Sequence, residues 1–202
     1  IESQQRERVW RPRWAGEMAG RTLGVVGLGA IGRATAVRAR AFDMRVLATR
    51  RRFLVGEQVD PDVDRMFPLD QLDDMLGLCD AVLLSAPSTV DTADLFNAER
   101  FAAMRPGSVF VNVSRGSLVD EPALVEALRS GHLAAAIIDV AKQEPAPPEH
   151  PFWDTPNLYL SPHCSASLEL YPDRLFELFV DNLGRLQRDE PLRNIVDAER
   201  GY

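Results

Sequence analysis

Three short polar segments of the sequence contain side chains that could do chemistry on a carbonyl group. They read N-V-S-R-G at residues 112–116, D-V-A-K-Q-E-P at residues 139–145 and S-P-H-C-S-A at residues 161–166. Their candidate catalytic residues are Arg115, Glu144 and His163. An arginine can stabilise a developing alkoxide, a histidine can transfer a proton, and a carboxylate can orient an imidazole. Taken singly, each residue also has a structural interpretation, as a turn arginine, a solvated loop acid or a core histidine.

A glycine-rich segment precedes these groups and predicts a phosphate-binding turn. Residues 27–32 read G-L-G-A-I-G, directly after an apolar run and at the start of a helical pattern. The first glycine permits a tight turn, the second lets the backbone approach a pyrophosphate, and the third allows close packing of helix on strand. We therefore expect dinucleotide binding, with a purely structural turn as the alternative. The residues expected to hold the cofactor here are Gly27, Gly29, Ala30, Ile31 and Gly32.

The end of the next apolar run indicates which dinucleotide is bound. Residues 49–52 read T-R-R-R, where an NAD site usually carries an acid that accepts hydrogen bonds from the ribose 2′-hydroxyl. Arginine suits the 2′-phosphate of NADP, because its planar fork matches phosphate oxygens. We expect Thr49, Arg50 and Arg51 to contact the cofactor, which is predicted to be NADP, with NAD possible. A solvated basic turn is the alternative.

The elements that must position these groups follow from an alternation of apolar runs and amphipathic stretches. This pattern predicts an α/β fold with a doubly wound parallel sheet, a Rossmann-type dinucleotide-binding domain. We expect strands at 22–26, 45–49, 80–85, 108–112, 134–139 and 158–161, and helices at 31–42, 69–78, 97–104, 121–130 and 171–187. In such a sheet the ligand crevice lies at the carboxyl ends of the strands, so Arg115, Glu144 and His163 can converge there.

Composition limits the classes of partner. A formal charge of -7 opposes general affinity for nucleic acid or anionic membranes, and no apolar run is long enough to span a bilayer. Two cysteines are too few for a disulfide scaffold, so we expect a reduced, cytoplasmic protein. Cys164 is expected to be a packed small hydrophobe, with an oxidisable thiol as the alternative. His132 and His150 lack metal-ligand spacing, so no metal is predicted.

Taken together, the motifs resemble the D-isomer-specific 2-hydroxyacid dehydrogenases over essentially the whole chain. The stretches D-N-L-G-R at residues 181–185 and E-P-L-R-N-I-V-D at residues 190–197 are similar to that family's C-terminal signature. Within the family, residues 49–52 and the S-A-P-S-T-V-D-T stretch at 85–92 look most like NADPH-dependent glyoxylate/hydroxypyruvate reductases. The resemblance implies reversible hydride transfer between NAD(P)H and C2 of a small 2-oxo or 2-hydroxy acid.

The resemblance also implies roles for individual residues. Arg115 would pair with the substrate carboxylate and polarise the carbonyl, His163 would donate the proton, and Glu144 would hold the imidazole. Asp139 would contact the nicotinamide carboxamide. The other cofactor contacts implied are Ser85, Ala86 and Pro87 at the adenine ribose, Ser114 near the nicotinamide, and Val113, Arg115, His163 and Ser165. Ala141 stands where family members often carry an aromatic residue, which leaves the substrate's size open.

The resemblance further implies a domain organisation. Residues 1–18 would form an arm or interdomain helix, 19–167 the dinucleotide-binding domain, and 168–202 the C-terminal return of a substrate domain whose N-terminal part the chain lacks. We therefore expect this chain alone to bind dinucleotide and to turn over substrate poorly. The basic arm with Trp10 and Trp14 predicts a homodimer, with burial in the substrate domain as the alternative.

Two other functions fit the same motifs. One is a binding module that senses dinucleotide, as transcriptional corepressors with this fold do, without physiological turnover. The other is an enzyme of the same family that acts on an unusual donor such as phosphite or formate.

Overall fold

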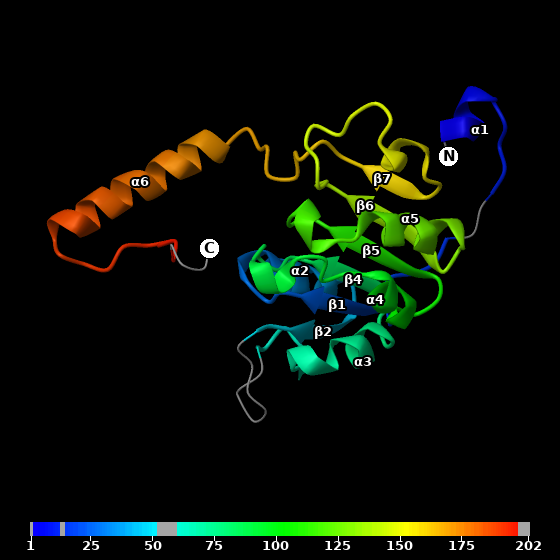
Figure 1. Ribbon diagram of the computed structural model, residues 1–202. Helices are drawn as coiled ribbons and strands as arrows, with labels where there is room; N and C mark the ends of the chain where they lie inside the picture. The colour runs from blue at the N-terminus through cyan, green and yellow to red at the C-terminus, as the bar shows by residue number, and fades with distance from the viewer. Residues whose placement is uncertain (1, 13–14, 52–59, 198–202) are drawn as a thin grey trace.

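All strands of the described part of the chain lie in one parallel sheet, ordered β3-β2-β1-β4-β5-β6-β7 (Figure 1). This computed structural model describes residues 2–12, 15–51 and 60–197. The strands are β1 (Thr22–Val26), β2 (Arg45–Thr49), β3 (Arg65–Phe67), β4 (Ala81–Leu84), β5 (Ser108–Asn112), β6 (Leu133–Ile138) and β7 (Leu158–Leu160). The strand order reverses between β1 and β4, the position at which doubly wound sheets open a ligand crevice.

Two of the helices, α4 and α5, begin after a residue whose side chain accepts a hydrogen bond from a free N–H group. The Asn97 side chain accepts a hydrogen bond from Arg100 N at 3.0 Å, and the Asp120 side chain accepts one from Ala123 N at 3.2 Å. The helices are α1 (Glu2–Arg6), α2 (Ala30–Ala41), α3 (Leu72–Leu76), α4 (Ala98–Ala103), α5 (Glu121–Arg129) and α6 (Tyr171–Gln187). Single 3₁₀ turns are η1 (Leu69–Gln71), η2 (Val90–Thr92), η3 (Gly116–Leu118) and η4 (Pro151–Asp154).

Apolar side chains fill both faces of the sheet, because successive residues of a strand point to opposite sides. On one face a cluster of aromatic rings packs under α3, α4 and α5, with the Phe96 and Phe110 ring centroids 4.8 Å apart. On the other face α2 packs on β1 and β2. That face is more open over β6 and β7, where Ile137 and Tyr159 are 39% and 62% exposed.

The predicted fold class is confirmed, and every expected strand and helix is present with bounds moved by a few residues. Two local differences stand out. The strand β3 was not predicted, because three residues are too few to show a periodic pattern. The helix expected at 69–78 is a 3₁₀ turn followed by the short helix α3.

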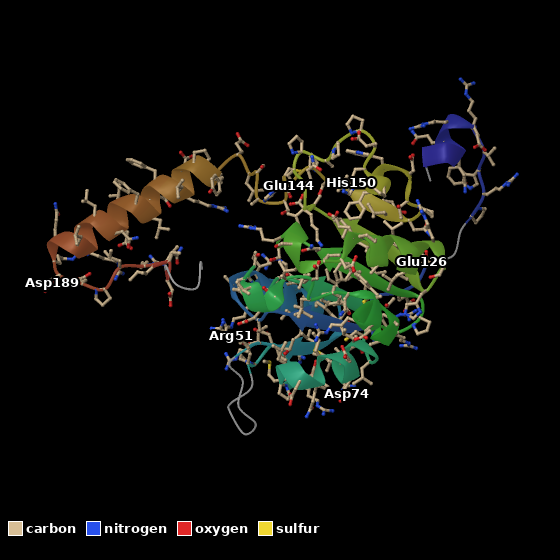
Figure 2. All side chains as sticks on the ribbon, viewed as in Figure 1. Arg51, Asp74, Glu126, Glu144, His150 and Asp189 are labelled. Carbon is tan, nitrogen blue, oxygen red and sulfur yellow. The ribbon has the colours of Figure 1, made fainter. Side chains whose placement is uncertain are left out.

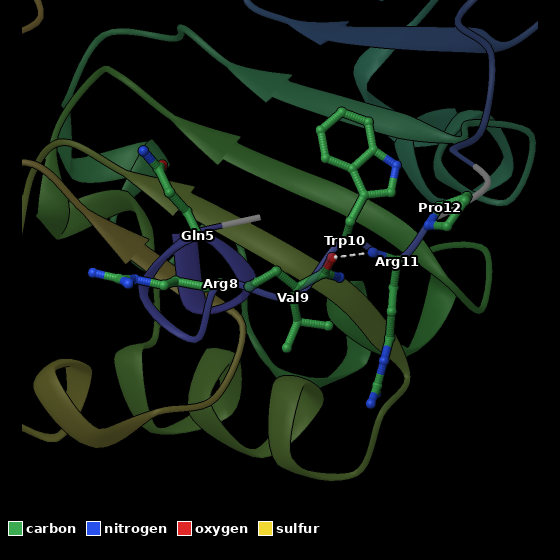
Figure 3. Close-up of a pocket in the computed structure, with 7 residues that line it drawn as sticks. Gln5, Arg8, Val9, Trp10, Arg11 and Pro12 are labelled. Atoms are coloured by element: carbon green, nitrogen blue, oxygen red, sulfur yellow. Dashed lines mark hydrogen bonds between the residues drawn. The ribbon is translucent and has the colours of Figure 1, made fainter.

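The two ends of the chain extend from this sheet. The helix α6, orange in Figure 1, stands away from the strands and has no buried residue; Phe176 and Phe179 on it are exposed. The arm carries the five-residue helix α1 and Trp10, which is 96% exposed. A hollow of about 700 Å³ beside the arm is lined only by arm residues from Gln4 to Pro12, so it contains no predicted site residue (Figure 3). The expectations for Trp14 and Arg52 lie outside the described residues.

Candidate active site

The glycine turn between β1 and α2 has the shape of a cradle. Gly27 has a φ of +100°, and a Cβ atom there would lie 2.5 Å from the backbone nitrogen of Ala86. A Cβ atom on Gly32 would lie 2.5 Å from the Gly27 carbonyl oxygen, so the helix packs tightly on the turn. At Gly29, in contrast, a Cβ atom would meet nothing within 4 Å. Gly27 and Gly32 therefore keep the turn compact, while the backbone at Gly29 faces open space.

The start of α2 could hold an anion. No side chain caps this helix at Gly29, and its first turn contains no acidic residue. The free N–H groups and the positive end of the helix dipole are therefore available to a phosphate. A cavity of about 680 Å³ extends from this turn to the residues after β2, β4 and β5. The predicted residues that line it are Gly27, Gly29, Ile31, Thr49, Arg50, Arg51, Ser85, Ala86, Pro87, Val113, Ser114 and Arg115.

The residues present fit a dinucleotide. Thr49 Oγ1 is buried in the cavity wall and has no hydrogen-bond partner within the described part of the chain. A ligand hydroxyl or phosphate could supply that partner. Arg50 and Arg51 follow it along the same wall, and Figure 2 shows Arg51 at the edge of the sheet. The glycine turn could hold a pyrophosphate, and the end of β2 could hold an adenosine carrying a 2′-phosphate.

A buried asparagine shapes the turn that carries Arg115. Asn112 Oδ1 accepts a hydrogen bond from Ser114 N at 3.0 Å, and Asn112 Nδ2 donates to Arg115 O at 3.1 Å. The Ser114 hydroxyl donates to Ala86 O, which ties this turn to the one after β4. Sequence reasoning missed the role of Asn112, although an asparagine at the end of an apolar strand is a usable signal.

The Arg115 turn also packs against the loop that carries Glu144. A Cβ atom on Gly116 would lie 2.0 Å from the carbonyl carbon of Ala141, so only glycine fits between these two backbones. This close approach brings residues after β5 and β6 together. This backbone contact therefore helps to hold the two loops together at the carboxyl edge of the sheet.

Glu144 and His163 are joined by a short hydrogen bond. Glu144 Oε2 lies 2.6 Å from His163 Nδ1, and Glu144 Oε1 accepts a hydrogen bond from Ala141 N at 2.9 Å. The contact with His163 lowers the pKa of Glu144 most; burial opposes this, and the Ala141 N–H and the charge of Arg115 lower it further. Because Nδ1 faces the carboxylate, Nε2 is the imidazole atom that can exchange a proton with a substrate.

Asp139 anchors the loop that carries His163. It is 3% exposed and accepts hydrogen bonds from Ser161 Oγ at 2.5 Å and from Cys164 N and Ser165 N, both at 3.0 Å. Burial raises the pKa of Asp139, but these hydrogen bonds outweigh burial and bring it down to about 2. The Asp139 carbonyl also accepts from His163 N at 2.8 Å. His163 itself has a φ of +50°, so this anchoring holds a left-handed backbone in place.

Some predicted residues lie outside the wall of the cavity. Within the described residues, the wall does not include Ala30, Gly32, Asp139, Glu144, His163 or Ser165. Ala30 and Gly32 belong to the first turn of α2, and the other four belong to the loops after β6 and β7. Arg115 connects the cavity with the loops after β6 and β7. It lines the cavity, and its positive charge lowers the pKa of Glu144.

One expectation for a cysteine is wrong. Cys164 is exposed rather than packed, because its loop crosses the surface; its backbone N–H donates to Asp139 and its carbonyl accepts a hydrogen bond from Ser167 N at 2.9 Å. Cys79 is buried, and burial raises its pKa to about 12. Among the described residues no three His, Cys, Asp or Glu side chains are grouped so as to hold a metal ion, and no helix is long and apolar enough to cross a membrane.

Comparisons with known proteins identify relatives of the whole chain. The glyoxylate reductase of Thermofilum pendens is 36% identical over 203 residues, which cover 98% of this chain and 58% of that protein. The glyoxylate/hydroxypyruvate reductase B of Citrobacter koseri is 38% identical over 192 residues, 93% of this chain and 57% of that protein. The chain thus spans a little under three fifths of the length of these curated relatives.

Solved structures show the same similarity. A D-isomer specific 2-hydroxyacid dehydrogenase from Xanthobacter autotrophicus, in complex with NADPH and MES, matches with a TM-score of 0.87 and 36% identity. The match covers 100% of this chain and 81% of that one. The NADPH-dependent glyoxylate/hydroxypyruvate reductase of Sinorhizobium meliloti, in complex with NADP and sulfate, matches with a TM-score of 0.88 and 32% identity, over 100% of this chain and 63% of that one.

A match to a protein family agrees with these relatives. It also agrees with the glycine cradle and with the contact between Glu144 and His163. Residues 1–165 correspond to the NAD-binding domain of the D-isomer specific 2-hydroxyacid dehydrogenases. This chain belongs to the D-isomer specific 2-hydroxyacid dehydrogenase family.

Proposed function

We propose that the whole protein is an NADPH-dependent reductase of a small 2-oxo acid such as glyoxylate or hydroxypyruvate. The observation that carries the proposal is the 2.6 Å contact between Glu144 and His163, beside an arginine that lines the cavity. A carboxylate, an imidazole and a guanidinium at one edge of the sheet supply the groups that reduction of a carbonyl requires.

Each of the three side chains has a separate task. Arg115 binds the substrate carboxylate and places positive charge beside the carbonyl oxygen, where negative charge develops. His163 donates a proton from Nε2 to that oxygen, and accepts it in the oxidation direction. Glu144 orients the imidazole and favours its protonated form. The nicotinamide, when bound, supplies the hydride.

The preference for NADPH rests on the end of β2. Arg50 and Arg51 line the cavity where an acid would favour NAD, and two arginines attract a 2′-phosphate. The relatives from Xanthobacter autotrophicus and Sinorhizobium meliloti, which were solved with NADPH and NADP, support the same preference. The proposal also includes the two predicted cofactor contacts, Asp139 at the nicotinamide carboxamide and Ser165.

This chain alone is proposed to bind dinucleotide without efficient turnover. Residues 1–18 act as an arm, 19–167 as the cofactor domain and 168–202 as the return into a substrate domain. The exposed apolar side chains of α6, including Phe176 and Phe179, support a role in contact with such a domain. Without a domain closing over the site, the substrate is neither aligned nor shielded from water.

The whole protein is further proposed to be a cytoplasmic homodimer. The two cysteines are not paired in a disulfide, which suits a reducing compartment. Trp10 is almost fully exposed in a basic arm, and aromatic residues next to arginine often anchor interfaces. Light scattering on the whole protein checks this, and a monomeric mass would contradict the dimer.

The proposed reaction is tested by replacing the proton donor. In the whole protein, consumption of NADPH is measured with glyoxylate, hydroxypyruvate and a bulky 2-oxo acid. His163→Ala should lower kcat by about 10²- to 10⁴-fold and leave NADPH binding intact, because only the proton transfer is lost. His132→Gln is the control, since that imidazole contacts Met104 O rather than the site. Unchanged kcat in His163→Ala contradicts the mechanism, and tight NADPH binding with no turnover of any acid would favour the binding module.

A further inference from the structure

One carboxylate outside the proposed active site holds both ends of the loop that carries Glu144. Glu121 is the first residue of α5. Its Oε1 accepts a hydrogen bond from Lys142 N at 2.7 Å, and its Oε2 lies 3.3 Å from His150 Nε2. The side chains of Glu121 and His150 are only 14% and 9% exposed. The loop between these two contacts therefore depends on a largely buried group from a different element.

The chemistry of this contact requires two acceptor atoms. His150 Nδ1 accepts a hydrogen bond from Phe152 N at 3.3 Å, so the ring proton sits on Nε2 and is donated to Glu121. Lys142 N is also a donor. Only a carboxylate offers one oxygen to each donor, because an amide of the same size would turn its NH₂ group toward one of them.

The contacts lead from Glu121 to the imidazole of His163. Lys142 follows Ala141, whose N–H donates to Glu144 Oε1 at 2.9 Å, and Glu144 Oε2 contacts His163. Figure 2 shows Glu144 and His150 on the same loop after β6. Holding Lys142 on one side and His150 on the other restricts where the Glu144 carboxylate can lie.

We propose that Glu121 is a positioning residue for the reaction, which acts by fixing the loop 141–150 so that Glu144 meets His163. The inference rests on the proposed function, because it assigns Glu121 a role through Glu144. Glu121 touches neither His163 nor the cavity. A simpler role would be that of a negative charge at the start of α5, where it meets the helix dipole.

Two substitutions separate these roles in the whole protein. Glu121→Gln removes one acceptor, and Glu121→Asp keeps the charge at the helix start but shortens the side chain by one methylene. Both should lower kcat about 10-fold with the KM for NADPH unchanged, since the cofactor cavity is not touched. Glu126→Gln is the matched control, because Glu126 is an exposed acid on the same helix (Figure 2). Full activity in Glu121→Asp would mean that Glu121 acts only as a helix charge, and would overturn the proposal.

A double-mutant cycle tests whether the effect passes through Glu144. On a Glu144→Gln background, Glu121→Gln should cost less than twofold in kcat, because the carboxylate that it positions is already gone. Losses that multiply in the double variant would overturn the proposal. If Glu144→Gln and His163→Ala both keep full kcat, the proposed function fails instead.

Hydrogen exchange gives a readout that does not depend on turnover. The Ala141 amide is bonded to Glu144 and not to Glu121, so it reports whether Glu144 stays in place. Glu121→Gln and Glu121→Asp should each speed Ala141 exchange at least 10-fold, whereas Glu126→Gln should leave it unchanged. Acceleration limited to Lys142 would show that the loop holds Glu144 without Glu121, and would overturn the proposal.

Discussion

Asp139→Asn is expected to destabilise the protein and to do so in a pH-dependent way. The substitution keeps the shape of a side chain that is 3% exposed, but it removes the charge. It also turns an NH₂ group toward hydrogen-bond donors, since Ser161 Oγ, Cys164 N and Ser165 N all donate to Asp139. Two hydrogen-bond donors that face each other in a buried site lower the free energy of unfolding, because neither has an acceptor.

The pH-dependent part of the loss follows from the pKa. The pKa of Asp139 is lowered from 3.8 to about 2, so the ionised form is favoured in the folded state. The difference corresponds to about 2 kcal/mol of unfolding free energy at neutral pH. Because the folded pKa lies below the unfolded one, this stability is present above about pH 4 and is lost as the pH falls toward about 2. At about pH 3 roughly half of it should remain.

Urea unfolding followed by circular dichroism measures this effect. The difference in unfolding free energy between wild type and Asp139→Asn should be about 2 kcal/mol larger at neutral pH than near the acid end of the window. Asp74→Asn, at an exposed position on α3, is the control and should show little change at either pH. A difference that is the same at about pH 3 and about pH 7 would refute the reasoning, because ionisation of Asp139 would then contribute nothing.

Three further outcomes are expected. Gly116→Ala should cost about 1–3 kcal/mol in thermal unfolding, because its Cβ would meet the backbone of the loop after β6 at 2.0 Å; an unchanged Tm would contradict that contact. Replacing Arg50 and Arg51 with alanine should raise the KM for NADPH about 10-fold, a loss of about 1.4 kcal/mol, and leave that for NADH nearly unchanged; equal changes for both cofactors would count against 2′-phosphate recognition. Glu144→Gln should move the pH profile of reduction toward acid, because a neutral amide no longer places a negative charge 2.6 Å from His163 Nδ1. An unchanged pH profile of reduction would contradict a role for the contact between Glu144 and His163 in the reaction.

Local patterns in the sequence were enough to predict much of the fold. The strands β1, β2, β4 and β5 are nearly continuous apolar runs, as expected for strands covered on both faces. Glycine spacing predicted the turn at residues 27–32, because the pattern G-x-G-x-x-G after an apolar run is typical of a phosphate-binding turn. The helix starts at Asn97 and Asp120 could likewise be read from neighbouring residues.

The grouping of Arg115, Glu144 and His163 needed one further rule. Their segments each follow a strand, and parallel strands place their carboxyl ends at one edge of the sheet. The 2.6 Å contact between Glu144 and His163 agrees with that prediction. The order of the motifs indicated a known family, and that resemblance implied a role for each residue. Spacing along the chain does not assign such roles by itself.

Only the tertiary structure decided how these side chains are held. The hydrogen bonds of Asp139 and the contact between Glu121 and His150 join residues more than 20 positions apart in the chain. The exposure of Cys164, likewise, depends on the path of a surface loop. Spacing along the chain predicts which residues share an edge of a sheet, because that depends on strand direction. It does not predict which donor meets which acceptor, because hydrogen bonds depend on differences of a few tenths of an ångström in the packing of separate loops.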